Sequence, residues 1–182
     1  MDVYLEGGAH LRRPMRNFLR RAVGSSHISI DVVACRSRER AVARFARASP
    51  SDSLLLVDSE GDDLNGLRQS VASRVGLPGT LDRTFFMVQL MEAWFLADRA
   101  VLAAYYGSRF NARSLPGNRQ SEQIPKQEVE QGLRNATRGT AKGAYDKTDH
   151  TPDLLNTLNP TTVYNACPHF KLLVDHLRII NP

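Results

Sequence analysis

No stretch of the sequence is long and apolar enough to cross a membrane. The longest apolar run, from Ala100 to Tyr106, has seven residues, whereas a spanning helix needs about 20. The N-terminal segment is rich in arginine and has no apolar stretch, so it does not resemble a secretory signal. Two cysteines, Cys35 and Cys167, are too few for a disulfide framework. We therefore expect a cytoplasmic protein with reduced thiols and no membrane partner.

Nucleotide-binding and zinc-binding motifs are missing as well. The sequence has neither a Walker phosphate-binding loop nor a Gly-rich dinucleotide fingerprint, so we do not expect it to bind ATP by those means. Cys167 and His169 have no partner ligands at the spacing of a zinc site.

The chain has 182 residues, of which 42% are hydrophobic and 24% are charged. This length and composition fit one globular domain with a full core. Within that single domain, 1–182, we expect an α/β core over 1–98 and a helical C-terminal extension over 99–182.

The net charge of +5 is unevenly distributed. Between His10 and Arg47 there are ten arginines and only two acidic residues, whereas the segment from Asp52 to Asp63 has five acids and no basic residue. A positive surface around an acidic centre suits an enzyme that holds a polyanion and acts on it with bound metal. A solvated basic face beside an acidic loop explains the same pattern equally well.

Short apolar runs and amphipathic segments alternate along the first ninety residues. Strands are expected at 3–6, 28–33, 54–57 and 85–88, with helices between them. This alternation predicts an α/β fold, a parallel sheet of about four strands flanked by helices. In the second half, helices are expected at 92–106 and 125–137, and at two later starts, Asn159-Pro160 and Pro168. These helices form a C-terminal layer.

Acidic residues end two of the predicted strands. Glu6 ends the first strand, and Asp58 ends the third, followed by Glu60 and Gly61. Open parallel sheets bind ligands beyond the carboxyl ends of their strands. Asp58 and Glu60 can reach one metal ion if the chain bends at Gly61, and carboxylates suit Mg²⁺ or Mn²⁺. A glutamate across the crevice is then a further ligand or a general acid/base on a phosphodiester.

Two sets of residues resemble known families. Glu6-Gly7 and the later strand end Asp58-Ser59-Glu60 resemble the toprim domain, a Rossmann-like fold of topoisomerases, primases and the overcoming-lysogenization-defect nucleases. Nearly the whole chain is similar to a toprim-like bacterial family, number 4276 among the domains of unknown function, often encoded beside ATPase genes of anti-phage defence islands. The runs that carry this second likeness are Met87–Asp98, Ile124–Lys126, Gly132–Thr137 and Lys142–Lys147.

The toprim resemblance implies a set of site residues. It assigns the toprim glutamate to Glu6 and the paired metal ligands to Asp58 and Glu60. Related nucleases often have a second acid where this chain has His10, and Glu92 is the best substitute for it. Such nucleases also use a lysine to neutralise the transition state, for which Lys126 is the first candidate. The candidate nucleic-acid contacts are Arg12, Arg13, Arg134, Arg138 and Lys142.

The resemblance thus implies a nuclease that depends on Mg²⁺ or Mn²⁺, acts on DNA or transfer RNA, and is controlled by a partner ATPase. The alternative is a non-catalytic toprim-like module that docks on an ATPase or on nucleic acid, and His10 in place of an acid favours it. The number of metal ions and the oligomeric state, including a homo-oligomer, stay open.

Overall fold

The computed structural model describes residues 1–24, 29–61 and 63–179, and in them four strands form one parallel sheet. The strand order is β2-β1-β3-β4, which confirms the predicted fold class. The predicted second strand begins at Ile28, which lies outside the described residues. The strands are β1 (Asp2–Leu5), β2 (Asp31–Ala34), β3 (Ser53–Asp58) and β4 (Thr84–Met87).

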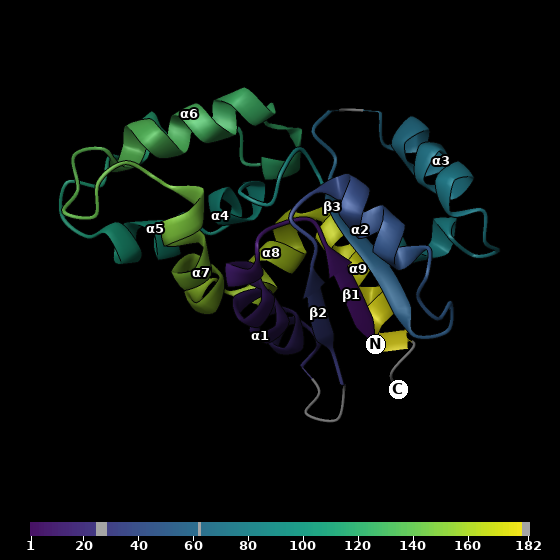
Figure 1. Cartoon of the computed structure of the whole chain (residues 1–182). Coiled ribbons are helices and arrows are strands. Elements are labelled where there is room, and N and C mark those ends of the chain that lie inside the picture. The colour runs from purple at the N-terminus through teal and green to yellow at the C-terminus, as the bar shows by residue number, and fades with distance from the viewer. Residues whose placement is uncertain (25–28, 62, 180–182) are drawn as a thin grey trace.

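Helices cover both faces of this sheet (Figure 1). Short 3-10 turns, η1 to η4, lie between some of the longer elements. The turns are η1 (Ala9–Leu11), η2 (Leu81–Arg83), η3 (Ala112–Ser114) and η4 (Ser121–Gln123). The helices are α1 (Arg12–Val23), α2 (Arg38–Phe45), α3 (Leu64–Val75), α4 (Ala93–Ala97), α5 (Arg99–Tyr106), α6 (Lys126–Thr137), α7 (Lys147–Thr157), α8 (Pro160–Ala166) and α9 (Pro168–Ile179).

The central strand β3 contributes side chains to two hydrophobic cores. Leu54 and Leu56 pack into the larger core, which also contains residues of α1 and α9. Leu55 and Val57 pack into the smaller core with residues of α2 and α3. Because successive side chains of a strand point to opposite faces, a continuous apolar run is what a strand buried on both faces requires.

The single helix predicted over 92–106 is wrong, because Asp98 divides it into α4 and α5. The Asp98 side chain is buried, and its carboxylate accepts hydrogen bonds from the backbone N–H of Val101 (3.3 Å) and of Asn159 (3.1 Å). An aspartate that bonds nearby backbone in this way caps a new helix instead of continuing the old one. The same side chain ties the start of α5 to the start of α8.

Helix α7 is not indicated by the sequence pattern, since it contains Pro152 and few apolar residues. The structure begins this helix with Asp146, whose carboxylate accepts hydrogen bonds from the N–H groups of Thr148 (2.7 Å) and Asp149 (3.1 Å). This cap stabilises the first turn. The cap therefore also holds Lys147, the first residue of α7, in place.

An aromatic cluster packs α4 against α9 and α1. The Trp94 ring is fully buried, and its centroid lies 4.8 Å from that of Phe170 and 5.7 Å from that of Phe18. These contacts join α4 to α9 and α1, so they also hold Glu92, which directly precedes α4. None of the helices in the described part of the chain is long and apolar enough to span a membrane.

Candidate functional site

Two predicted acids meet at the carboxyl end of the sheet. Glu6 follows β1 and Asp58 is the last residue of β3, and these strands are neighbours in the sheet. The backbone N–H of Asp58 donates a hydrogen bond to Oε2 of Glu6 at 3.2 Å. Burial raises the pKa of Glu6, although the positive charge of Arg38 opposes this shift. Both acids therefore lie where a parallel sheet places its ligand site.

Asp58 is the buried centre of this cluster, with only 6% of its surface exposed. Its Oδ1 accepts a hydrogen bond from the N–H of Met91 (2.9 Å), and its Oδ2 lies 3.5 Å from Nζ of Lys147. Burial, together with the negative charges of Glu92 and Glu6, raises the pKa of Asp58 to about 7, although the positive charge of Lys147 opposes this shift. The protein alone thus stabilises the Asp58 anion poorly.

Glu92 joins the cluster from the segment between β4 and α4. It is 2% exposed, and its carboxylate lies 3.4 Å from Nζ of Lys147 and accepts a hydrogen bond from the Tyr145 hydroxyl at 2.8 Å. Burial raises the pKa of Tyr145, and the Glu92 charge adds to this shift, so the hydroxyl keeps its proton. Burial lowers the pKa of Lys147, but the charges of Asp58 and Glu92 outweigh it and the net shift is upward. Lys147 therefore bridges two buried carboxylates as a cation.

Glu60 points in a different direction from Asp58. The chain bends at Gly61, as the sequence suggested, and Glu60 directly before it has a left-handed backbone with a φ of 55°. Its half-exposed carboxylate lies 2.9 Å from Nζ of Lys126 and 3.4 Å from the Arg38 guanidinium. The hydrogen bond with Lys126 lowers the pKa of Glu60 and raises that of Lys126. In this structure the carboxylates of Asp58 and Glu60 therefore pair with different lysines, Lys147 and Lys126.

Arg38 and Lys147 are site residues that the sequence analysis missed. Arg38, the first residue of α2, donates a hydrogen bond to the carbonyl oxygen of Asp58 (2.7 Å) and lies 3.6 Å from Oε2 of Glu6. Arg38 was predictable from the sequence, because it follows β2 closely and therefore lies at the same edge of the sheet as Glu6 and Asp58. Lys147 ends the run 142–147 that carried the family resemblance, and its role required the unpredicted helix α7.

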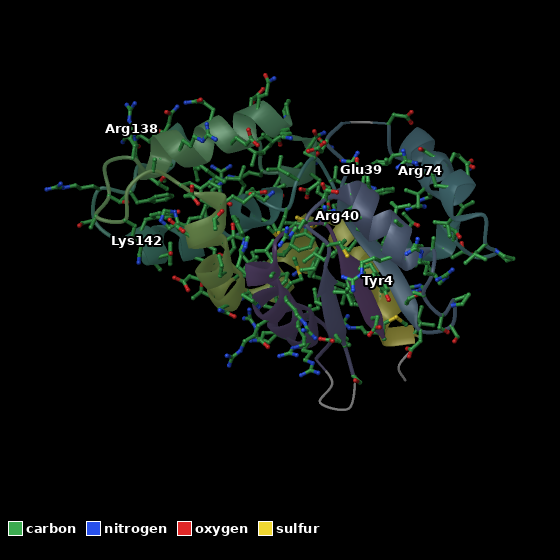
Figure 2. All side chains as sticks on the ribbon, in the orientation of Figure 1. Tyr4, Glu39, Arg40, Arg74, Arg138 and Lys142 are labelled. Atoms are coloured by element: carbon green, nitrogen blue, oxygen red, sulfur yellow. The ribbon has the colours of Figure 1, made fainter. Side chains whose placement is uncertain are left out.

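The other predicted basic residues are not gathered around the acids. Arg12 pairs with Asp31 at 2.8 Å on the outer side of α1. Figure 2 shows Arg138 and Lys142 at the outer end of the α6 region, away from Arg40 on α2, and Lys142 lies over the Tyr105 ring. His10 lies exposed in η1, and Arg13 is exposed on α1. Arg134 lies in the last turn of α6.

The pair formed by Glu60 and Lys126 is expected to contribute little to stability. Both side chains are partly exposed, and such ion pairs typically contribute less than about 1 kcal/mol. Lys126→Ala should therefore change the free energy of unfolding in urea by no more than this amount. A loss of several kcal/mol would mean that Lys126 has a structural role that its contacts do not indicate.

The acids suit a divalent cation only if water and substrate complete its coordination. Among residues 1–24, 29–61 and 63–179, no three acidic, histidine or cysteine side chains are grouped so that they could hold a metal ion. Mg²⁺, however, is commonly bound by one or two carboxylates together with waters and substrate phosphates. Glu6 and Asp58 provide two carboxylates at neighbouring strand ends, and the Glu6 charge adds to the burial that raises the pKa of Asp58.

The fold and this charged edge define an α/β protein whose candidate site lies at the carboxyl ends of parallel strands. The chain matches the model of the family described as "Domain of unknown function (DUF4276)" over residues 10–178, and it belongs to this family. The matched region includes Asp58, Glu92 and Lys147, whereas Glu6 precedes it. Searches of curated proteins and of solved structures found no match.

Proposed function

We propose that this protein is a divalent-metal-dependent phosphodiesterase that acts on nucleic acid. The observation that carries the proposal is the buried Asp58 carboxylate, which shares the end of the sheet with Glu6 and Glu92. These like charges, together with burial, raise the pKa of Asp58 to about 7 even beside Lys147. A hard cation that binds together with a phosphate relieves this repulsion.

Each residue of the cluster has a distinct role in the proposed reaction. Asp58 and Glu6 would hold Mg²⁺ or Mn²⁺, which when bound supplies Lewis-acid stabilisation of a phosphoryl oxygen. Lys147 and Lys126 are cations at the edge of the site and would neutralise charge that develops on the scissile phosphate. Glu92 orients Lys147 through their 3.4 Å contact. Arg38 positions Glu6 and the end of β3.

We further propose that the site is of the toprim type, related to that of the overcoming-lysogenization-defect nucleases. The support is the strand-end order Glu6, Asp58, Glu60 on a parallel sheet, together with membership of the DUF4276 family. On the same basis we propose that the substrate is DNA or transfer RNA, and that a partner ATPase of an anti-phage defence system controls the activity.

A non-catalytic binding module is the second candidate function, and one specific observation favours it. Three of the acids are each paired with a basic side chain: Glu6 with Arg38 at 3.6 Å, Asp58 with Lys147 at 3.5 Å, and Glu60 with Lys126 at 2.9 Å. Such pairing balances charge without a metal ion. This candidate predicts metal-independent binding of nucleic acid or of the ATPase, with no turnover.

Isothermal titration of Mg²⁺ and of Mn²⁺ into the wild type, Asp58→Ala and Glu128→Gln distinguishes the two candidates. Glu128 is an exposed acid on α6 and serves as the matched control. The phosphodiesterase proposal expects millimolar or tighter binding to the wild type and the control, no binding to Asp58→Ala, and metal-dependent cleavage of DNA or RNA. Cleavage by Asp58→Ala at the wild-type rate would refute the site assignment. Nucleic-acid binding that needs neither metal nor Asp58, without cleavage, would instead establish the binding module.

A further inference from the structure

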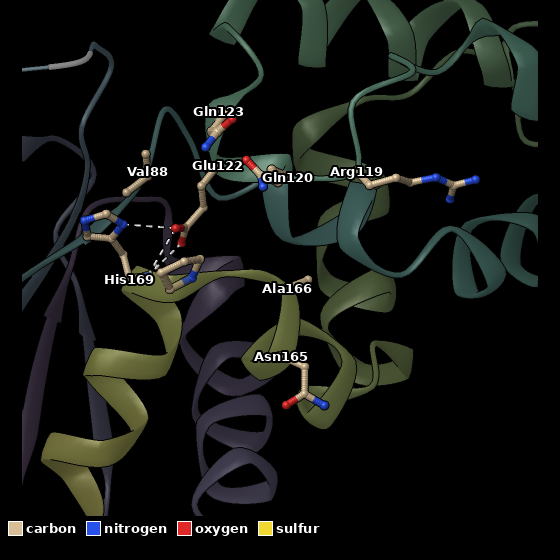
Figure 3. Close-up of a pocket in the computed structure, with 9 residues that line it drawn as sticks. Val88, Arg119, Gln120, Glu122, Gln123, Asn165, Ala166 and His169 are labelled. Carbon is tan, nitrogen blue, oxygen red and sulfur yellow. Dashed lines mark hydrogen bonds and ion pairs between the residues drawn. The ribbon is translucent and has the colours of Figure 1, made fainter.

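A cavity of about 460 Å³ lies beside the acidic site, between the end of β4 and the helices α8 and α9 (Figure 3). Its volume falls within the range of about 300–1,000 Å³ that is typical of sites for small organic ligands. The apolar residues that line it are Val88, Ala166 and Pro168. The polar and charged residues are Arg119, Gln120, Glu122, Gln123, Asn165 and His169.

The polar centre of this cavity is a paired glutamate and histidine. The Glu122 carboxylate is 7% exposed and accepts hydrogen bonds from the backbone N–H of His169 at 3.1 and 3.2 Å. Its Oε2 also lies 3.0 Å from Nδ1 of His169. A carboxylate only accepts hydrogen bonds, so Nδ1 carries a proton, and Nε2 is an acceptor when the ring holds this proton alone. Among the residues that the structure describes, Nε2 has no hydrogen-bond partner.

We propose that this cavity binds a nucleotide whose base carries an exocyclic amino group. The His169 Nε2 and the Glu122 carboxylate are acceptors for the N–H groups of such a base. The side-chain amides of Gln120 and Gln123 each offer a donor and an acceptor, the combination that reads base edges in nucleic-acid complexes. Ala166 and Pro168, which are less buried than Val88, supply apolar contacts for the ring face. An amino-bearing base therefore fits this lining better than uracil, whose edge lacks that donor.

The position of the cavity connects it to the acidic site. Val88 lines the cavity, and three residues later the N–H of Met91 bonds to Asp58, followed by Glu92. The two sites thus lie along one short segment after β4. A polynucleotide with its scissile phosphate at Asp58 can place a neighbouring nucleotide in the cavity. This connection rests on the proposed function, whereas binding of a free nucleotide does not.

Isothermal titration of 5′-GMP, 5′-CMP, 5′-UMP and inorganic phosphate tests the cavity directly. GMP and CMP should bind more tightly than UMP or phosphate, and His169→Ala should weaken both by about tenfold or more. This variant keeps the backbone N–H that bonds to Glu122, so α9 should begin as before. Gln127→Ala, an exposed amide on α6, is the control and should bind like the wild type. Equal affinity for all four probes, or wild-type binding by His169→Ala, would overturn the proposal.

A competition experiment identifies the source of the nucleotide. If a 5′-phosphorylated oligonucleotide displaces GMP, the cavity holds a nucleotide of a polynucleotide; if it does not, the ligand is a free mononucleotide, and either result requires that GMP binds. Asp58→Ala separates this inference from the proposed function, because it should lose cleavage but keep GMP binding. GMP binding by a protein that never cleaves nucleic acid would leave the cavity proposal standing alone. Metal-dependent cleavage without GMP binding would leave only the proposed function.

Discussion

Asp58→Asn is expected to abolish phosphodiester hydrolysis and, at the same time, to stabilise the protein at pH 8. The loss of rate should be at least about a thousandfold, because the variant removes the carboxylate at the centre of the proposed metal site. The gain in stability follows from the pKa of Asp58, which folding raises from 3.8 to about 7. Loss of activity together with a gain in stability would separate a functional acid from a structural one.

The sign of the stability effect depends on pH. Between the unfolded and folded pKa values, the folded wild type binds more protons than the unfolded chain, so its stability falls as the pH rises through this window. Asparagine does not titrate and escapes this loss. The free energy of unfolding of the variant should exceed that of the wild type by on the order of 2 kcal/mol at pH 8 and by little at pH 4. Urea unfolding at both pH values measures this difference, and a variant that is less stable than the wild type at pH 8 would contradict it.

Lys147→Met is expected to lower both the rate and the stability. Methionine keeps much of the apolar stem but removes the cation that contacts Asp58 and Glu92 at 3.5 and 3.4 Å. Two buried carboxylates then lose their shared cation. This loss should lower the free energy of unfolding by about 2–3 kcal/mol at pH 8. The deficit should shrink toward pH 5, because Asp58 can then take up a proton in the folded state.

The rate effect of Lys147→Met follows from its proposed contact with the phosphate. A drop of about a hundredfold or more in kcat is expected if Lys147 neutralises developing charge. Lys171→Met is the matched control, since Lys171 is an exposed lysine of α9 that lies over the Tyr164 ring outside the cluster. This control should keep the wild-type rate and nearly the wild-type stability. Equal effects of the two substitutions would rule out a specific role for Lys147.

Local patterns along the chain were enough to predict the sheet and the helices that flank it. The run 54–57 predicted a strand buried on both faces because such a strand needs apolar side chains on each side. Parallel strands also present their carboxyl ends at one edge, so the positions of Glu6 and Asp58 at strand ends predicted that they would meet. Asn159-Pro160 likewise predicted the start of α8, because its cap is made by neighbouring residues.

The partners of the acids could not be predicted in this way, because they come from distant parts of the chain. Asp98 caps α5 locally at the N–H of Val101, but it also accepts a hydrogen bond from the N–H of Asn159, which no local window contains. Lys147 reaches Asp58 only because α7 forms from a weakly helical segment and packs against α1. Glu60, whose φ is positive, pairs with Lys126, whereas Asp58 pairs with Lys147.

The local sequence therefore determined the order of strands and helices and the positions of the acids at strand ends, because periodicity and capping act over a few residues. Long-range packing decided which cation faces which acid and how far each acid is buried. It also decided where the cavity opens. The electrostatic energy of a carboxylate depends on its burial and on charges within a few ångströms, and these neighbours are fixed only when the chain folds.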